Sequence, residues 1–164
     1  MSTEEKKVKE SSGGQGFVSL PDEGKPYSAL GTEWKLVAAS GDTGGVCEVI
    51  EAVFPPQGGF PPHYHHFDEG SYFLEGSMTL TVGDRPIKAS AATFAFMPRD
   101  VVHSWLNESS APCKVLIWFM PSFGPGIEGA LEELSEWSRG EPDMAKLSAI
   151  FQKYDTVAVE QAEE

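Results

Sequence analysis

The stretch from residue 57 to residue 76, QGGFPPHYHHFDEGSYFLEG, holds three of the four histidines in this chain of 164 residues. Its glycines and prolines argue against a helix, so we expect His63 and His65 to lie on an extended segment. Alternate residues of an extended chain share a face, which puts these two imidazoles on one side and His66 on the other. Glu69 follows four residues after His65, and a bend would bring its carboxylate to the same side.

The fourth histidine, His103, belongs to a later strand-like run, VVHSWL, which follows the turn residue Pro98. If the two segments lie side by side, three imidazole nitrogens and one carboxylate converge. Such a donor set suits a divalent transition metal such as iron, nickel, copper, manganese or zinc. We therefore predict a metal centre made of His63, His65, Glu69 and His103.

Short runs of strand type surround the histidine stretch on both sides, and turn signals such as GDR and NESSAP separate them. Many short strands with no long helix between them predict an antiparallel sandwich or barrel. After Pro121 the apolar spacing becomes helical in GIEGALEELSEWSRG and again in PDMAKLSAIFQKY. We expect a disordered tail over residues 1–16, a β-barrel over 17–121 and a helical extension over 122–164, which could act as a lid or a dimer contact.

Composition narrows the classes of partner. The formal net charge of -13 argues against nucleic acid and anionic membranes, because both repel an acidic surface. No apolar stretch is long enough to cross a bilayer, and the N-terminal residues lack the apolar core of a signal peptide. We therefore expect a cytoplasmic protein whose partners are a small molecule and a second copy of itself in a homodimer.

The spacing of the candidate ligands resembles the first motif of the cupin superfamily, G-x5-H-x-H-x3-E-x6-G, which is matched by His63, His65, Glu69 and Gly76. The resemblance implies an all-β fold with C-terminal helices, in which the core is a double-stranded β-helix, the cupin jelly-roll barrel. That architecture agrees with the many short strands.

AATFAFMPRDVVHSWLN, over residues 91–107, resembles the second cupin motif, G-x5-P-x-G-x2-H-x3-N. It supplies Pro98, His103 and Asn107 at the expected spacing. None of the departures from the two motifs falls on a ligand, so they bear on local turn geometry. Three positions where the motifs have glycine carry other residues, namely Gln57, Ala92 and Asp100.

Within this superfamily the chain is similar to small single-domain, quercetinase-like proteins, because its helical tail ends in IFQKYDTVAV. Such proteins hold a divalent metal with three histidines and one glutamate. By similarity, one nickel, iron, manganese, cobalt or copper ion per chain, with zinc less expected, would be bound by His63, His65, Glu69 and His103. The resemblance implies a metal-dependent dioxygenase acting on a flavonol-like, aromatic or enol-bearing small molecule, with dioxygen as co-substrate.

A metal-bound enol or phenol loses its proton easily, and Glu69 could accept that proton if an apolar pocket raises its pKa. We expect Trp105, Tyr72 and Phe60 to bind a flat substrate, with Trp105 on the same face as His103. The same first steps would serve a non-oxidative isomerase, cyclase or decarboxylase, and a non-catalytic ligand-binding protein would need no transition metal. The four ligands by themselves leave these alternatives open.

Overall fold

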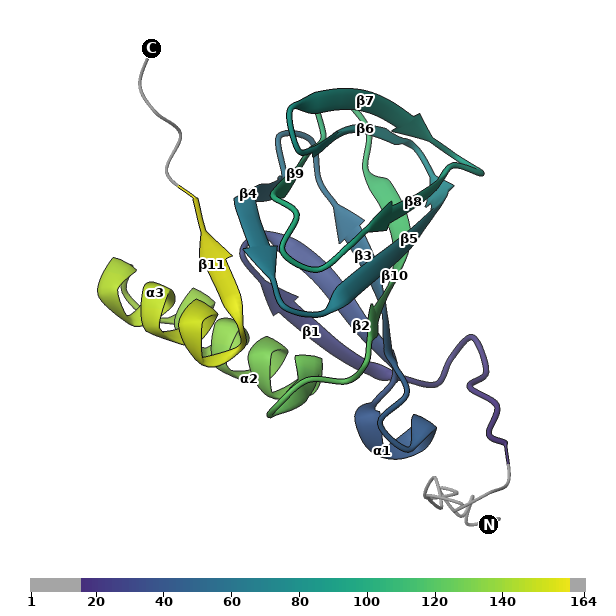
Figure 1. Cartoon of the computed structure of the whole chain (residues 1–164), viewed down its shortest axis with the longest axis vertical. Coiled ribbons are helices and arrows are strands. Elements are labelled where there is room, and N and C mark those ends of the chain that lie inside the picture. The colour runs from purple at the N-terminus through teal and green to yellow at the C-terminus, as the bar shows by residue number, and fades with distance from the viewer. Residues whose placement is uncertain (1–15, 160–164) are drawn as a thin grey trace, which may run out of the picture.

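A computed structural model describes residues 16–159 of the chain and shows a β-barrel with helices packed on its flank (Figure 1). The described residues form eleven strands and three helices. In chain order these are β1 (Lys25–Ala29), β2 (Thr32–Ala38), α1 (Ser40–Thr43), β3 (Glu48–Phe54), β4 (Gly59–His65), β5 (Asp68–Glu75), β6 (Ser77–Val82), β7 (Arg85–Ser90), β8 (Phe94–Met97), β9 (His103–Leu106), β10 (Cys113–Met120), α2 (Gly126–Arg139), α3 (Met144–Lys153) and β11 (Thr156–Ala158).

The strands form two sheets that face each other across the core. The first has the order β1-β2-β3-β10-β5-β8 and the second β11-β4-β9-β6-β7, and neighbouring strands within each are antiparallel. The predicted all-β class with C-terminal helices is confirmed. Because neighbours such as β3 and β10 are distant in sequence, the barrel brings remote segments together.

Strand β10 shows why these sequences form a barrel wall. Its residues alternate between buried and partly exposed, with Cys113, Val115, Ile117 and Phe119 on the inner face. Side chains of a strand point alternately to its two faces, so this alternation of burial fits a strand with one face toward the core. Burial of these side chains is the main driving force that closes the two sheets on each other.

At the three positions where the cupin motifs have glycine, the turns keep a backbone conformation that glycine favours. Gln57, Ala92 and Asp100, which replace the motif glycines, have φ angles of 62°, 67° and 66°. This left-handed conformation costs an L-residue about 1 kcal/mol relative to glycine. The retained glycine, Gly76, has φ 79°, and a Cβ there would lie 2.5 Å from the carbonyl oxygen of Pro112. The turn shape is therefore set by the surrounding strands, at a cost in local strain.

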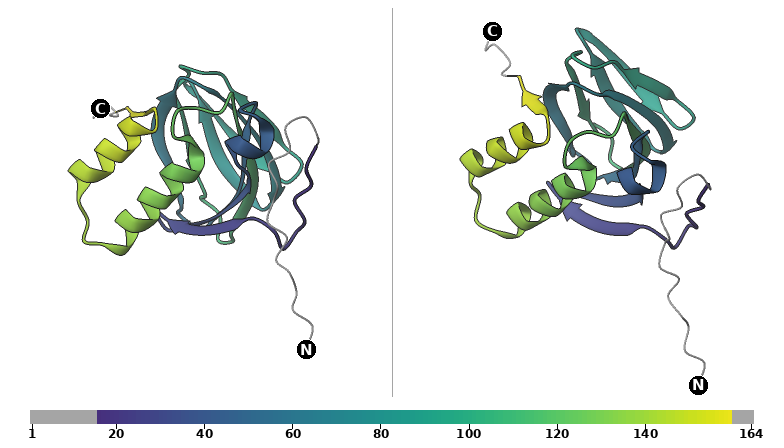
Figure 2. Two further views of the ribbon diagram at one scale, coloured as in Figure 1. Left: turned by 90° about the horizontal axis from the view of Figure 1, so that it is seen from below. Right: turned by 60° about the horizontal axis from the view of Figure 1, so that its bottom comes forward.

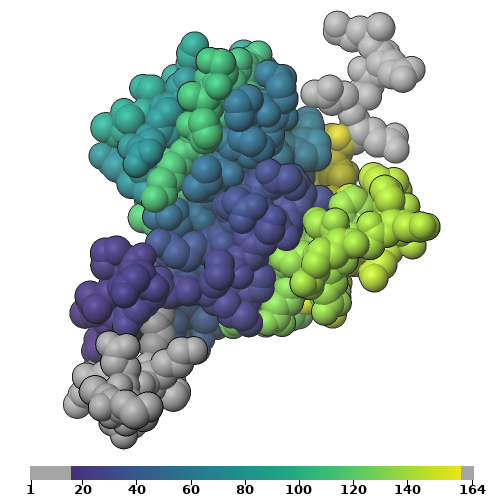
Figure 3. All heavy atoms as spheres, turned by 180° about the vertical axis from the view of Figure 1, so that it is seen from behind, coloured from purple at the N-terminus to yellow at the C-terminus, as the bar shows by residue number. Residues whose placement is uncertain are grey.

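Strand β1 was not predicted, because it has only five residues and includes Pro26. It lies at the edge of its sheet, where a proline is tolerated. Its Lys25 ammonium contacts Glu132 at 2.6 Å and Glu128 at 3.1 Å, which links the strand to α2. Figure 3 shows this N-terminal part of the chain beside the C-terminal helices.

Both predicted C-terminal helices are present, side by side on one flank of the barrel (Figure 2). Helix α3 begins after Asp143, whose side chain accepts a hydrogen bond from the Lys146 N–H at 2.9 Å. Apolar residues of both helices, including Leu131 and Ile150, join the same hydrophobic core as the strands. The expected boundary after residue 121 therefore coincides with the end of β10 but does not separate two cores.

The expected N-terminal tail lies outside the described residues, apart from Gly16. Over residues 16–159 no helix combines the length and the apolar character that crossing a membrane requires.

Candidate metal centre

The four candidate ligands meet between the two sheets. His63 and His65 lie on β4, Glu69 lies on β5, and His103 lies on β9. In the antiparallel pair of β4 and β9, His63 is the register partner of His103. One donor atom from each residue lies within 4.8 Å of all the others, and all four side chains are buried. The structure thus brings together the whole ligand set that the sequence predicts.

Each of the three imidazoles is oriented by a backbone carbonyl two residues away in the chain. The Nδ1 atoms lie 2.8 Å from the oxygen of Pro61 for His63, 2.7 Å from that of Phe67 for His65, and 2.9 Å from that of Val101 for His103. A carbonyl oxygen only accepts, so each Nδ1 carries a hydrogen and donates it. In a neutral imidazole this leaves the lone pair on Nε2, which is the atom available to a metal.

The Nε2 atoms and the Glu69 carboxylate lie so close together that a positive charge is needed among them to offset their repulsion. Glu69 Oε2 lies 3.1 Å from His65 Nε2 and 3.4 Å from His103 Nε2. The buried His103 Nε2 satisfies no hydrogen bond with good geometry. Lone pairs this close repel unless a shared proton or a metal ion lies among them. Two ligands that each lie about 2.1 Å from one ion and at right angles are about 3 Å apart, so the residues fit a divalent transition metal.

The charges of the metal-free cluster follow from burial and from these contacts. Burial pushes the pKa of Glu69 upward, but the nearby His103 and His65 outweigh it and hold the pKa at about 2. Burial, reinforced by the charge of His103, lowers the pKa of His63 to about 4. Burial also lowers the pKa of His103, but Glu69 outweighs this and the net shift is upward. The low pKa keeps Glu69 a carboxylate in the metal-free cluster, and the raised Glu69 pKa that a ready base needs is not found.

Aromatic rings pack against two of the histidine ligands. The His65 ring stacks on Phe67 with centroids 3.9 Å apart, and Phe67 stacks in turn on Phe123 at 3.9 Å. The His63 ring meets Phe60 edge-on at 4.8 Å. Rings packed this way restrict the imidazole rotamers, which lowers the entropy lost when an ion binds.

The second motif supplies supports as well as His103. The Asp100 N–H donates to the His65 carbonyl at 2.8 Å, which ties the turn before β9 to the strand of the first two ligands. The Asn107 amide donates to the carbonyl oxygens of Phe54 and Ala111, at 3.1 and 2.9 Å. Asn107 therefore fixes the end of β9 and does not approach the metal centre as a ligand.

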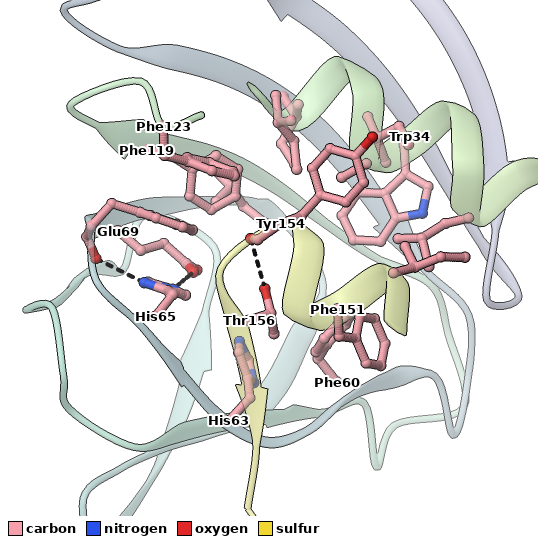
Figure 4. Close-up of a pocket in the computed structure, with 18 of the residues that line it drawn as sticks. Trp34, Phe60, His63, His65, Glu69, Phe119, Phe123, Phe151, Tyr154 and Thr156 are labelled. Atoms are coloured by element: carbon pink, nitrogen blue, oxygen red, sulfur yellow. Dashed lines mark hydrogen bonds and ion pairs between the residues drawn. The ribbon is translucent and has the colours of Figure 1, made fainter. Parts of the chain in front are cut away.

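The cluster opens onto a cavity of about 90 Å³, shown in Figure 4. Of the four candidate ligands, His63, His65 and Glu69 line this cavity, and His103 is not among its lining residues. The remaining wall is almost wholly apolar. The barrel contributes residues such as Trp34, Phe54, Phe60, Trp105 and Ile117, and the C-terminal segment contributes Leu131, Leu134, Ile150, Phe151, Tyr154 and Thr156.

Two of the three residues predicted to bind substrate are at this cavity. Trp105 and Phe60 line it, but Tyr72 does not. Tyr72 follows Ser71 on β5 and points to the outer face of the barrel, where its side chain is 39% exposed. Its even position, against the odd position of Glu69, already put it on the opposite face of the strand. Tyr72 therefore does not line the cavity at which it was predicted to bind substrate.

Sequence reasoning missed the contribution of the helices to the cavity, in particular that of Phe151 and Tyr154. It placed His66 correctly on the outside, where the residue is exposed. His66 nevertheless has contacts: its backbone N–H donates to Asp155 at 3.1 Å and its ring contacts Asp100. His66 thus joins the turn before β11 to the turn before β9.

Comparison with known proteins agrees with this geometry. A family model described as a cupin domain matches residues 50–119, a span that contains all four candidate ligands. The chain carries a cupin domain. The predicted superfamily is confirmed, and the two-sheet barrel around the ligands is the cupin fold.

The cupin chain is also similar to a quercetin 2,3-dioxygenase from Bacillus subtilis (strain 168). The two sequences are 29% identical over 104 residues, which cover 57% of this chain. The match spans only 31% of that relative's length, so the similarity is distant and partial.

Solved structures with this cupin fold include the polyketide cyclase RemF from Streptomyces resistomycificus, at a TM-score of 0.58 and 23% identity, covering 66% of this chain and 81% of that one. KdgF from Halomonas sp. aligns at a TM-score of 0.60 and 17% identity, covering 68% and 98%. At these identities the likeness shows the shared fold.

Proposed function

We propose that this cupin is a metal-dependent oxygenase, of dioxygenase type, that acts on an aromatic or enol-bearing small molecule. The observation that carries the proposal is the buried cluster of three histidines and one glutamate beside an apolar cavity. The partial similarity to a quercetin 2,3-dioxygenase supports it. Nickel, iron, manganese, cobalt and copper all suit the donor set, with zinc less expected.

Each side chain has a role that follows from its position. A divalent ion held by His63, His65, Glu69 and His103 would stabilise the oxyanion of a bound enol or phenol. Glu69 is the only carboxylate among the described residues that line the cavity, so it is the group available to take the substrate proton.

The apolar wall of the cavity would bind the substrate and limit its contact with water. Trp105 and Phe60 line the cavity and would contact a flat aromatic substrate, and residues of the C-terminal helices add to the apolar wall that would displace water when a substrate binds. In a dry site an electron-rich enolate is protected from reprotonation by solvent. The substrate would then react with dioxygen, which is the second small molecule of the proposal.

Elemental analysis of the purified chain, combined with an oxygen electrode, tests this proposal. We expect about one transition metal ion per chain and oxygen uptake with a flavonol or another enol as substrate. Glu69→Gln should lower turnover far more than Asp68→Asn, because Asp68 points to Arg99 on the surface, 2.8 Å away. A metal-loaded protein that converts an enol with no oxygen uptake would be a non-oxidative cyclase, isomerase or decarboxylase. A chain without transition metal would be a ligand-binding cupin.

The proposal also covers partners and location. We propose a cytoplasmic homodimer that binds neither nucleic acid nor membrane, in keeping with its formal net charge of -13. Light scattering of the purified protein should give twice the chain mass of 17.8 kDa.

A further inference from the structure

We infer that two copies of this chain associate through the outer face of β5, β8 and β10, and not through the C-terminal helices. The inference rests on the proposed function, because it assigns the interface of the homodimer proposed there. Aromatic and aliphatic side chains of these three strands point away from the core and form what we call the outer apolar face, namely Tyr72, Leu74, Phe94, Phe96, Leu116 and Trp118.

Strand pairing makes the side chains of the outer apolar face neighbours. Tyr72 is the register partner of Leu116 on β10 and of Phe94 on β8. In the next row on the same face, one residue of β5 lies between Trp118 and Phe96. Residues in register across antiparallel strands share a face and contact each other. The side chains thus form one continuous surface across the three strands.

The central ring of this surface is held flat. The residue between Trp118 and Phe96 is Gly70, where a Cβ would lie 2.4 Å from the Trp118 indole. The indole therefore rests directly on the strand backbone. The Phe94 ring stacks against it, with centroids 6.0 Å apart. Rings fixed in this way lose little conformational entropy when a partner packs on them.

The outer apolar face is large for a surface left in water. The side chains of Phe94, Phe96 and Tyr72 are 59%, 46% and 39% exposed. An aromatic side chain has about 150–250 Å² of surface, so these three rings alone expose on the order of 300 Å². Monomeric soluble proteins rarely expose larger contiguous apolar patches, and such patches mark interaction sites. We therefore expect this face to be covered by a partner.

Strand β8 is also a sheet edge without protective charges. Among the strands of the described residues it pairs with β5 alone, and its sequence, FAFM, contains neither a charge nor a proline. Lysine and proline discourage pairing between sheet edges, and both occur in the edge strands β1 and β7. The outer apolar face thus ends at an edge that does not repel a second copy.

Charge favours an identical chain as the partner. With a formal net charge of -13, two copies repel each other and meet most easily where acidic side chains are absent or paired. The outer apolar face carries no charged side chain. Glu51, the register partner of Leu116 on β3, contacts Lys35 at 3.4 Å and Lys114 at 3.1 Å. A basic partner would be attracted to the acidic remainder of the surface instead.

The C-terminal helices are less suited to a contact between copies. Helix α2 carries four glutamates and one arginine, so copies that met through it would bring acidic side chains together. The helix packs against β1, at the opposite edge of the sheet from β8. Figure 1 shows both C-terminal helices away from β8, so they leave the outer apolar face open.

Sedimentation equilibrium of the purified full chain, over a wide range of protein concentration, tests the inference. We expect the parent to be a dimer. Phe94→Glu should raise the dissociation constant at least about 100-fold, because a two-fold contact buries the introduced charge twice. Met144→Glu places the same charge on α3, where Met144 is 68% exposed, and should leave the dimer intact. Circular dichroism and metal content equal to those of the parent verify that each variant is folded.

Salt gives a second measurement on the parent protein. Screening weakens the repulsion between two acidic copies, so the dissociation constant of an apolar contact should fall as sodium chloride is added. A dimer that weakens in salt would be held by ion pairs between the copies, which would overturn the inference.

The remaining outcomes separate this inference from the proposals above. A dimer that Phe94→Glu leaves unchanged, or that Met144→Glu dissociates, would overturn the outer apolar face as the interface, while the homodimer would stand. A parent that is monomeric at every concentration would overturn both, and the oxygenase proposal would be unaffected.

Discussion

Thr156 of β11 lies in register with His65 of β4. The C-terminal strand is thus the direct neighbour of the strand that carries two of the four candidate ligands. Next to this pairing, the Val159 N–H donates to the Pro62 carbonyl at 2.9 Å. The segment after residue 121 adjoins the metal centre in two ways, because β11 covers the edge of the ligand strand and residues of α2 and α3 line the cavity.

Val159→Pro tests whether β11 stabilises the ligand strand. The substitution removes the N–H that donates to Pro62, whereas the control Val159→Ala keeps it. We expect the proline variant to lose about 1–3 kcal/mol of unfolding free energy relative to the alanine variant, measured by urea denaturation. It should also release its metal faster to a chelator. Equal stability and equal release rates in the two variants would show that β11 is dispensable for the site.

His103→Ala tests the metal centre, with His66→Ala as its control. Replacing a partner of a ligand already lowers metal affinity by about 10–100-fold, so loss of a ligand should cost at least as much. His66 is exposed and turned away from the cluster, so its variant should keep the metal. The measurement is metal content after dialysis against a weak chelator. Full metal retention by the His103 variant would refute the assigned site.

Ala92→Gly should stabilise the protein. Ala92 has φ 67°, a conformation that glycine adopts without strain, so we expect a gain of about 1 kcal/mol in unfolding free energy. The adjacent Ala91 is also exposed but does not have a positive φ, so Ala91→Gly should be neutral or destabilising. Both are compared in metal-free protein by chemical denaturation. A loss of stability in Ala92→Gly would mean that the turn is not strained.

Glu48→Gln should make stability less dependent on pH. Burial raises the pKa of Glu48 above its ordinary value of 4.5, and the hydrogen bond from the Ile127 N–H offsets this only in part. The folded state then holds the proton more tightly than the unfolded chain does, so stability falls as the pH rises from about 4.5 through the folded pKa.

Glutamine keeps the acceptor for Ile127 but cannot ionise. The stability of Glu48→Gln relative to the parent should therefore rise between pH 4 and pH 7, as followed by urea denaturation at each pH. Glu136→Gln, which removes an exposed carboxylate from α2, is the control. A difference that stays constant over this pH range would contradict the expected role of Glu48.

Much of the site was predictable because its signals are local. The spacing of His63, His65 and Glu69 places their side chains on one side of an extended segment with a bend, and the structure has that arrangement. Short runs of strand-type residues between turn signals likewise predicted strands such as β10. By contrast, Tyr72 was assigned to the cavity on its aromatic character alone, although its strand parity pointed outward.

The sequence alone determined the ligand set, the barrel class and the two C-terminal helices, because residue type and short-range periodicity encode them. Only the tertiary structure decided that His103 is the cross-strand partner of His63, that β11 pairs with β4, and that Phe151 meets Phe60 across the cavity. These contacts join residues far apart in the chain. They follow from how the two sheets and the helices share one hydrophobic core, which is a property of the folded chain and not of any short segment.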